Sequence, residues 1–203
     1  MFMNYSVVHT STHGNYRFID CLTHPTTEQV AFSPAQTEDD SVLDAYTTGG
    51  TGGRGVLALR SGVSLLDVTS SVEVVDIDDK AHVSLVARWS GNTAEYVVIL
   101  ADVFVAIARA DATRFLGLKK GAALDRNGRR VRITVRNVSA TDVRVALQTL
   151  TESGWKTDLA VTDVNSPLAA TPGSVGFGVF AGIGSPRRIA RLAGWHATRF
   201  PRL

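Results

Sequence analysis

Hydrophobic and polar residues alternate along much of the chain, and the alternation is clearest in two neighbouring segments. In residues 130–136 valine or isoleucine occupies every second position, with arginine or threonine between them. Residues 142–149 show a similar alternation after a turn at residues 137–141. A period of two puts successive side chains on opposite faces of a β-strand. The two segments therefore predict an antiparallel hairpin with one face toward the core and one polar face.

The same alternation, bounded by Gly, Asn, Asp and Ser, predicts strands through the rest of the chain. Residues 101–114 have some helical spacing, but valine and isoleucine alternate there, so no long helix is expected. Many short strands are typical of a β-sandwich or barrel. We expect one all-β domain over residues 1–203, in which residues 1–45 form a less regular N-terminal segment. The further strands are expected at residues 5–9, 16–22, 56–59, 72–77, 82–89, 96–101, 103–109, 174–182 and 189–197.

Composition narrows the class of protein further. Hydrophobic residues make up 44% of the 203 residues and charged residues 20%, which suits a domain with a large core and excludes a disordered chain. The single cysteine, Cys21, excludes an internal disulfide. A formal net charge of +2 gives no electrostatic reason to expect nucleic acid as a partner.

The sequence carries no pattern for secretion or membrane insertion. Its first residues lack both the basic region and the apolar region of a signal peptide. The longest apolar run, residues 96–101, is far shorter than the ~20 residues of a membrane-spanning helix. We expect a soluble protein that is made in the cytoplasm and does not insert into a membrane.

The C-terminal third has a recognisable order of motifs. It contains Gly-Trp-Lys at residues 154–156, expected on a strand, then Asp-bearing residues 158–163, expected in a loop, and Gly-Ser-Val-Gly-Phe-Gly at 173–178. This order resembles the back half of a concanavalin A-like (laminin-G-like) jelly roll, and the upstream strands match that fold over about residues 56–200. The resemblance implies an antiparallel jelly-roll β-sandwich.

The resemblance also implies a class of function. Small domains of this kind recur in tail and capsid-surface proteins of phages that infect actinobacteria. It implies a non-enzymatic virion structural or adhesion protein, a minor tail or capsid-surface component. Its partners would be other virion proteins, further copies of itself in a homo-oligomer, and a host cell-surface glycan. The alternative is a free carbohydrate-binding lectin, which has the same fold but is not part of a virion.

Enzymatic function is not favoured by the acidic residues. A glycoside hydrolase on this fold needs two facing carboxyl groups roughly 5–10 Å apart. Residues 73–79 read Glu-Val-Val-Asp-Ile-Asp-Asp, and this spacing offers no second glutamate for acid–base chemistry. Gly50, Gly52 and Gly55 have the spacing of a nucleotide-binding loop, but a strand rather than a helix follows them. We expect no enzyme and no cofactor.

Metal binding is likewise not favoured. Carboxylate and amide oxygens on loops can bind calcium, but the candidates here are better explained as solvated turn residues. The five histidines do not have the spacing of metal ligands. We therefore expect no metal site. The residues that carry such oxygens are Asp76, Asp78, Asp79 and Asn92.

Arginines are the most suggestive polar residues. Arg132, Arg136 and Arg144 project from the polar side of the predicted hairpin, and we expect Arg88 to join them. Guanidinium groups bind acidic sugars or the carboxylates of a partner. A solvated sheet face is the plainer alternative.

Three tryptophans could stack on sugar rings. Trp89 and Trp195 fall on apolar faces and are expected in the core, whereas Trp155 follows a glycine in a turn and is expected to be exposed. The candidate ligand-binding or partner-binding residues are Arg88, Arg132, Arg136, Arg144 and Trp155.

Overall fold

The chain folds into two antiparallel β-sheets. Its computed structural model describes residues 6–13, 16–22, 30–34, 42–47, 54–60, 64–90, 96–101, 104–109, 115–120, 127–180 and 188–199. This part contains only strands, so it has no helix long and apolar enough to cross a membrane. The strands are β1 (Ser6–His13), β2 (Tyr16–Leu22), β3 (Val30–Pro34), β4 (Val42–Thr47), β5 (Arg54–Arg60), β6 (Val68–Ile77), β7 (His82–Trp89), β8 (Tyr96–Leu100), β9 (Phe104–Arg109), β10 (Gly117–Lys120), β11 (Arg129–Asn137), β12 (Val143–Thr151), β13 (Gly154–Asp163), β14 (Ser174–Phe180) and β15 (Arg188–Arg199).

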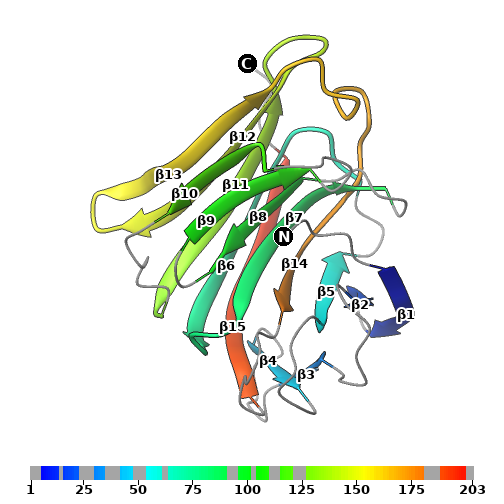
Figure 1. The fold of residues 1–203 in the computed structure, drawn as a ribbon, viewed down its shortest axis with the longest axis vertical. Helices are drawn as coiled ribbons and strands as arrows, with labels where there is room; N and C mark the ends of the chain where they lie inside the picture. The colour runs from blue at the N-terminus through cyan, green and yellow to red at the C-terminus, as the bar shows by residue number, and fades with distance from the viewer. Residues whose placement is uncertain are drawn as a thin grey trace.

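The two sheets form a sandwich (Figure 1). Sheet A has eight strands in the order β1-β2-β5-β14-β7-β8-β9-β10, and sheet B has seven in the order β13-β12-β11-β6-β15-β4-β3. At one side of the sandwich β10 of sheet A packs on β13 of sheet B. The antiparallel jelly-roll β-sandwich expected from the sequence is confirmed.

The N-terminal segment holds more regular structure than its sequence predicts. β1 and β2 pair with each other and join sheet A through β5, while β3 and β4 join sheet B through β15. The short strands β3, β4 and β10 were not expected, and the expected loop at residues 158–163 is wrong because these residues continue the strand β13. The residues of β3, β4 and β10 do not alternate between apolar and polar side chains, so they carry no strand pattern: they read Val-Ala-Phe-Ser-Pro, Val-Leu-Asp-Ala-Tyr-Thr and Gly-Leu-Lys-Lys.

The main core lies between the sheets and uses the alternate residues that the sequence predicts. Burying one aliphatic side chain of this size contributes about 1.5–3 kcal/mol, so the inward set holds the register of the hairpin firmly. The inward residues of β11 and β12 are at most 1% exposed: Val131, Ile133, Val135, Val143, Val145 and Leu147.

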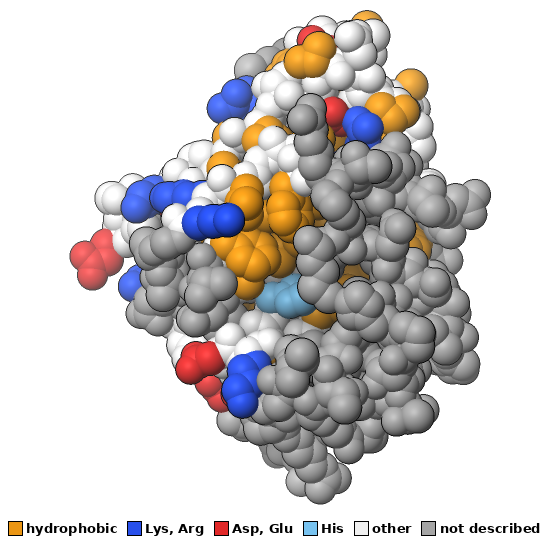
Figure 2. Space-filling view, in the orientation of Figure 1, with side chains coloured by type: hydrophobic (Ala, Val, Ile, Leu, Met, Phe, Trp, Pro, Cys, Tyr) orange, Lys and Arg blue, Asp and Glu red, His pale blue; other side chains and the backbone are white. Residues whose placement is uncertain are grey.

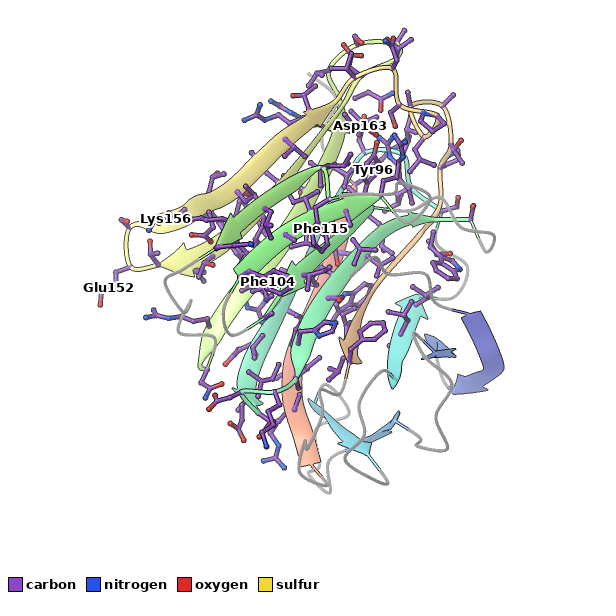
Figure 3. All side chains as sticks on the ribbon, viewed as in Figure 1. Tyr96, Phe104, Phe115, Glu152, Lys156 and Asp163 are labelled. Atoms are coloured by element: carbon purple, nitrogen blue, oxygen red, sulfur yellow. The ribbon has the colours of Figure 1, made fainter. Side chains whose placement is uncertain are left out.

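A second apolar cluster covers the outer face of sheet A. It contains Leu57, Val86 and Ile99 from three strands, with Phe104 and Phe115 packed against it. Figure 3 labels the two phenylalanines, and Figure 2, in the same orientation, shows hydrophobic side chains gathered near the middle of this face. The outer face of β11 and β12 in sheet B differs from it, because apart from Ala146 and Leu150 it carries polar side chains.

The glycine motif at residues 173–178 begins β14. A Cβ atom at Gly173 would collide with the backbone of Arg88 and Trp89 on β7. A Cβ atom at Gly176 would collide with the carbonyl oxygen of Ala58 on β5. Glycine lets β14 lie this close to both neighbours.

Candidate functional site

Three of the expected arginines lie together on the outer face of sheet B. β11 and β12 pair so that Arg136 stands directly opposite Arg144, and Arg132 stands opposite Gln148. Their neighbours along each strand point into the core, so the period of two turns these residues outward. Arg136 and Arg144 are exposed, and Arg132 is half-buried.

A β-bulge brings Trp155 onto the same face. β13 pairs Leu159 with Leu147 and Thr157 with Gln148, which leaves Asp158 as one extra residue. An unbroken register would pair Asp158 with Gln148 and turn Trp155 toward the opposite face. The extra residue thus places Trp155 and Thr157 outward, whereas Leu159 remains packed against the core.

Trp155 and Arg132 form a stacked pair. The guanidinium carbon of Arg132 lies 4.1 Å from the centroid of the Trp155 ring, well within the range of a cation–π interaction. Arg132 Nε donates to Gln148 Oε1 at 2.7 Å, and Gln148 Nε2 donates to Thr157 Oγ1 at 2.9 Å. Partial burial lowers the pKa of Arg132, which still remains charged at neutral pH. We refer to Trp155, Arg132, Gln148 and Thr157 as the Trp155 platform.

The start of β13 is held in place by the hairpin that precedes it. Gly154 has a φ of 106°, a backbone conformation that favours glycine. Thr151 Oγ1 donates to the Gly154 carbonyl at 2.7 Å, and Thr149 Oγ1 donates to Asp158 Oδ2 at 2.6 Å. Figure 3 shows this hairpin tip, marked by the labels of Glu152 and Lys156, projecting from the sandwich. These bonds fix the backbone on both sides of Trp155.

Short side chains separate the platform from the arginine pair. Thr134 pairs with Ala146, and Ala146 pairs with Ala160, so one row of small residues crosses three strands. Arg132 and Arg136 lie on either side of this row. They are four residues apart on one strand, a distance of about 13 Å between Cα atoms.

Arg88 does not lie on this face, and its prediction as a ligand-binding residue is wrong. Its side chain is fully buried. Its guanidinium donates to the carbonyls of Leu66 and Leu168, at 2.7 and 2.6 Å, and to Asn137 Oδ1 at 2.7 Å. Arg88 has a φ of 59°, which interrupts the regular strand geometry at this residue. Burial lowers its pKa, while its interactions with Tyr96 and Asp67 oppose that shift.

A second buried polar group lies near Arg88 and joins the two sheets. Tyr96 on β8 donates its hydroxyl to Asp163 Oδ2 on β13 at 2.7 Å and lies 2.6 Å from Ser166 Oγ (Figure 3 labels Tyr96 and Asp163). Arg109 on β9 donates to both carboxylate oxygens of Asp163, at 2.8 and 3.0 Å. Burial raises the pKa of Tyr96. No sequence pattern predicts this cluster, since its members lie on separate elements.

The other two tryptophans pack in apolar clusters, Trp89 on the outer face of sheet A and Trp195, half-buried, against the main core. Trp89 is 4% exposed and belongs to the second apolar cluster. Trp195 packs against the main core, 6.1 Å from Phe177 between ring centroids, and its indole N–H donates to Ser70 Oγ at 3.1 Å. Trp155 is therefore the tryptophan that reaches the outer face of sheet B.

The acidic candidates do not converge. Glu73 lies 3.9 Å from Arg130, and Asp78 accepts the backbone N–H of Lys80 in a turn. No group of three or more His, Cys, Asp or Glu among the described residues could hold a metal ion. Asn92 and the glycines at 50 and 52 lie outside the described residues.

Comparisons with known proteins indicate what the fold resembles. No family model matches the chain, and no curated protein matches its sequence. Among solved structures, a carbohydrate-binding module, CBM66 from Bacillus subtilis, is 12% identical, with a TM-score of 0.53 over 85% of this chain and 95% of that one. The CBM2 module of the evolved Dit of Lactobacillus casei BL23 phage J-1 is 13% identical, with a TM-score of 0.50 over 82% of this chain and 76% of that one. At these identities the likeness shows a shared β-sandwich fold.

Proposed function

We propose that this chain is a non-catalytic carbohydrate-binding module and that the Trp155 platform contacts the sugar. The observation that carries the proposal is the stacked pair of Trp155 and Arg132, 4.1 Å apart on an outward face. An aromatic ring offers an apolar surface to the C–H groups of a sugar. Arg132, which covers one face of the ring, and Gln148 add hydrogen-bonding groups, and the other face of the ring is the one that would contact the sugar. The two structures of similar fold, both carbohydrate-binding modules by name, support this class of ligand.

The setting that we propose is the surface of a phage virion. The chain would act there as an adhesion component of the tail or capsid surface, assembled with other virion proteins and with further copies of itself. The similar fold of a module from a phage Dit protein supports this setting. A free lectin is the second candidate, because the same platform serves either protein.

A glycan array tests the proposed binding. We expect the wild-type protein to bind sugars and Trp155→Ala to lose that binding, since it removes the stacking surface. Val164→Ala is the matched control, because Val164 is exposed but lies in the loop after β13. Equal binding by Trp155→Ala, or no binding by the wild-type protein to any sugar, would contradict the proposal.

Two further measurements test the other two parts of the proposal, the absence of catalysis and the virion setting. Release of reducing ends from a bound glycan would contradict a non-catalytic module. Mass spectrometry of purified phage particles tests the setting, and absence of the chain from the particles would favour the free lectin.

A further inference from the structure

We infer that the Trp155 platform binds a sugar that carries a methyl group, either a 6-deoxy sugar or an acetylated one, and that Leu150 contacts this methyl group. The inference rests on the proposed function and names the class of sugar. It depends on where the large apolar side chains and the unused hydrogen-bond donors lie on the outer face of sheet B.

Leu150 on β12 lies directly opposite Trp155 on β13. The same two strands pair Gln148 with Thr157, and this pair points outward in the Trp155 platform. Leu150 follows Gln148 by two residues on β12, so its side chain points outward as well. Cβ atoms at directly opposite positions are about 4.5–5.5 Å apart. Leu150 therefore adds apolar surface next to the Trp155 ring.

Leu150 stays exposed in spite of this neighbour. Its exposed fraction is 38%, on a strand whose other outward residues are Arg144, Ala146 and Gln148. Leu150 and Trp155 are the two large apolar side chains among the outward residues of β11, β12 and β13. A single exposed leucine is common on protein surfaces, but this one adjoins the ring that we propose to bind sugar. A ligand that covers Leu150 is stabilised because apolar surface leaves water.

Hydrogen-bond donors lie at a different place in the platform. The indole N–H of Trp155 and the two terminal nitrogens of Arg132 donate to no residue in the described part of the chain. These groups can donate to the hydroxyl or carbonyl oxygens of a sugar. Arg132 lies in the row of Gln148, about 7 Å along the strands from the row of Leu150. One sugar ring with its substituents spans that distance, so it can contact the donors and Leu150 together.

The surroundings of Leu150 favour a methyl group over a hydroxymethyl group. Arg130, the outward arginine two residues before Arg132 on β11, lies 3.9 Å from Glu73 and donates to the carbonyl of Gly194, so its guanidinium is already engaged. A hydroxyl group placed against Leu150 would lose water and gain no hydrogen bond from the leucine, which is costly. A methyl group at that place loses no hydrogen bond. The site therefore favours a sugar with oxygen atoms along one edge and a methyl group at the other.

The experiment compares pairs of monosaccharides that differ by a methyl group, using two-dimensional NMR titration to measure each Kd. L-fucose with L-galactose and L-rhamnose with L-mannose test a 6-deoxy sugar, because the methyl group replaces a hydroxymethyl group. N-acetylglucosamine with N-formylglucosamine tests an acetyl group. The proteins are the wild type, Leu150→Gln, Trp155→Ala and Leu118→Gln. Leu118 is the matched control, since it is a leucine on β10 of sheet A with an exposed fraction of 42%.

The wild type should bind the methyl-bearing member of at least one pair about fourfold or more tightly, the ratio expected from burial of one methyl-sized group. Leu150→Gln should reduce this ratio to below about twofold, because the methyl group loses its apolar contact, and Leu118→Gln should keep it. Trp155→Ala should weaken the binding of both members, since both stack on the ring. A preference within the first two pairs assigns a 6-deoxy sugar, and one within the third pair assigns an acetylated sugar. Thermal unfolding checks that every variant is folded.

The results that overturn the inference differ from those that overturn the proposed function. Equal affinity for both members of every pair, or a methyl preference that Leu150→Gln keeps, would overturn the inference and leave sugar binding intact. So would a loss of the preference in Leu118→Gln, or a wild type that binds other sugars on the glycan array and none of these monosaccharides. Absence of binding to every sugar, both in the titrations and on the array, would instead overturn the proposed function.

Discussion

Arg88→Met tests whether Arg88 stabilises the fold, which is the role that its buried hydrogen bonds indicate in place of the predicted ligand binding. The substitution keeps an unbranched side chain but removes the donors for Leu66 O, Leu168 O and Asn137 Oδ1. Each hydrogen bond to a charged group contributes about 1.5–3 kcal/mol, and the sum over the three lost bonds is an upper bound on the loss of stability. The buried guanidinium also carries a desolvation cost that methionine does not have. The net loss in the free energy of unfolding should be about 3–5 kcal/mol, as when one partner of a buried charged group is removed.

Urea denaturation followed by circular dichroism measures this loss. Arg144→Met is the matched control, because the same substitution at an exposed position should change stability by no more than about 0.5 kcal/mol. Glycan binding by folded Arg88→Met should equal that of the wild type, since Arg88 does not reach the outer face of sheet B. A loss below about 1 kcal/mol, or a folded variant that no longer binds sugar, would refute the structural role.

Three other changes should alter stability or sugar binding, each in a different direction. Tyr96 has a raised pKa in the folded state, so its contribution to the free energy of unfolding is complete below its unfolded pKa of about 10 and declines as the pH rises above that value. Tyr96→Phe should therefore reduce the loss of stability at alkaline pH, which urea denaturation at a series of pH values would measure. Arg144→Glu should raise the free energy of unfolding by about 0.2–1 kcal/mol through a cross-strand pair with Arg136, which urea denaturation would measure. Deletion of Asp158 should move Trp155 from the outer face of sheet B to the opposite face. Sugar binding should then be lost, and the maximum of the tryptophan fluorescence emission should shift.

The sequence predicts the hairpin of β11 and β12 well because alternation is a local property. Seven consecutive residues determine which side chains share a face, and burial of the apolar half then fixes the register. The placement of Arg132, Arg136 and Arg144 on one face therefore needed no knowledge of the rest of the fold. The neighbour of that face on β13, Thr157, followed only once the pairing with β13 was known.

Arg88 shows where a local pattern fails. In the alternation of β7 it occupies a polar position, and an arginine there is usually solvated. Its partners Leu66, Asn137 and Leu168 lie 22 to 80 residues away, where the loops at one end of the sandwich leave buried carbonyl and amide oxygens. A buried acceptor without a donor is costly, so a long donor from β7 is drawn inward. The spacing of residues in the sequence does not show that these buried oxygens require a donor.

Trp155 was expected to be exposed because it follows a glycine in a turn. The structure has it half-buried, and it lies on the outer face for a different cause. In a regular strand Trp155, Thr157, Leu159 and Val161 would share one face, and the last two pack against the core. Alternation alone would therefore bury Trp155. Asp158 changes the outcome, since one extra residue reverses the side of everything before it. Aspartate is a poor strand residue, and its carboxylate accepts the hydroxyl of Thr149, so the position of the bulge is set by polar chemistry that hydrophobic periodicity does not measure.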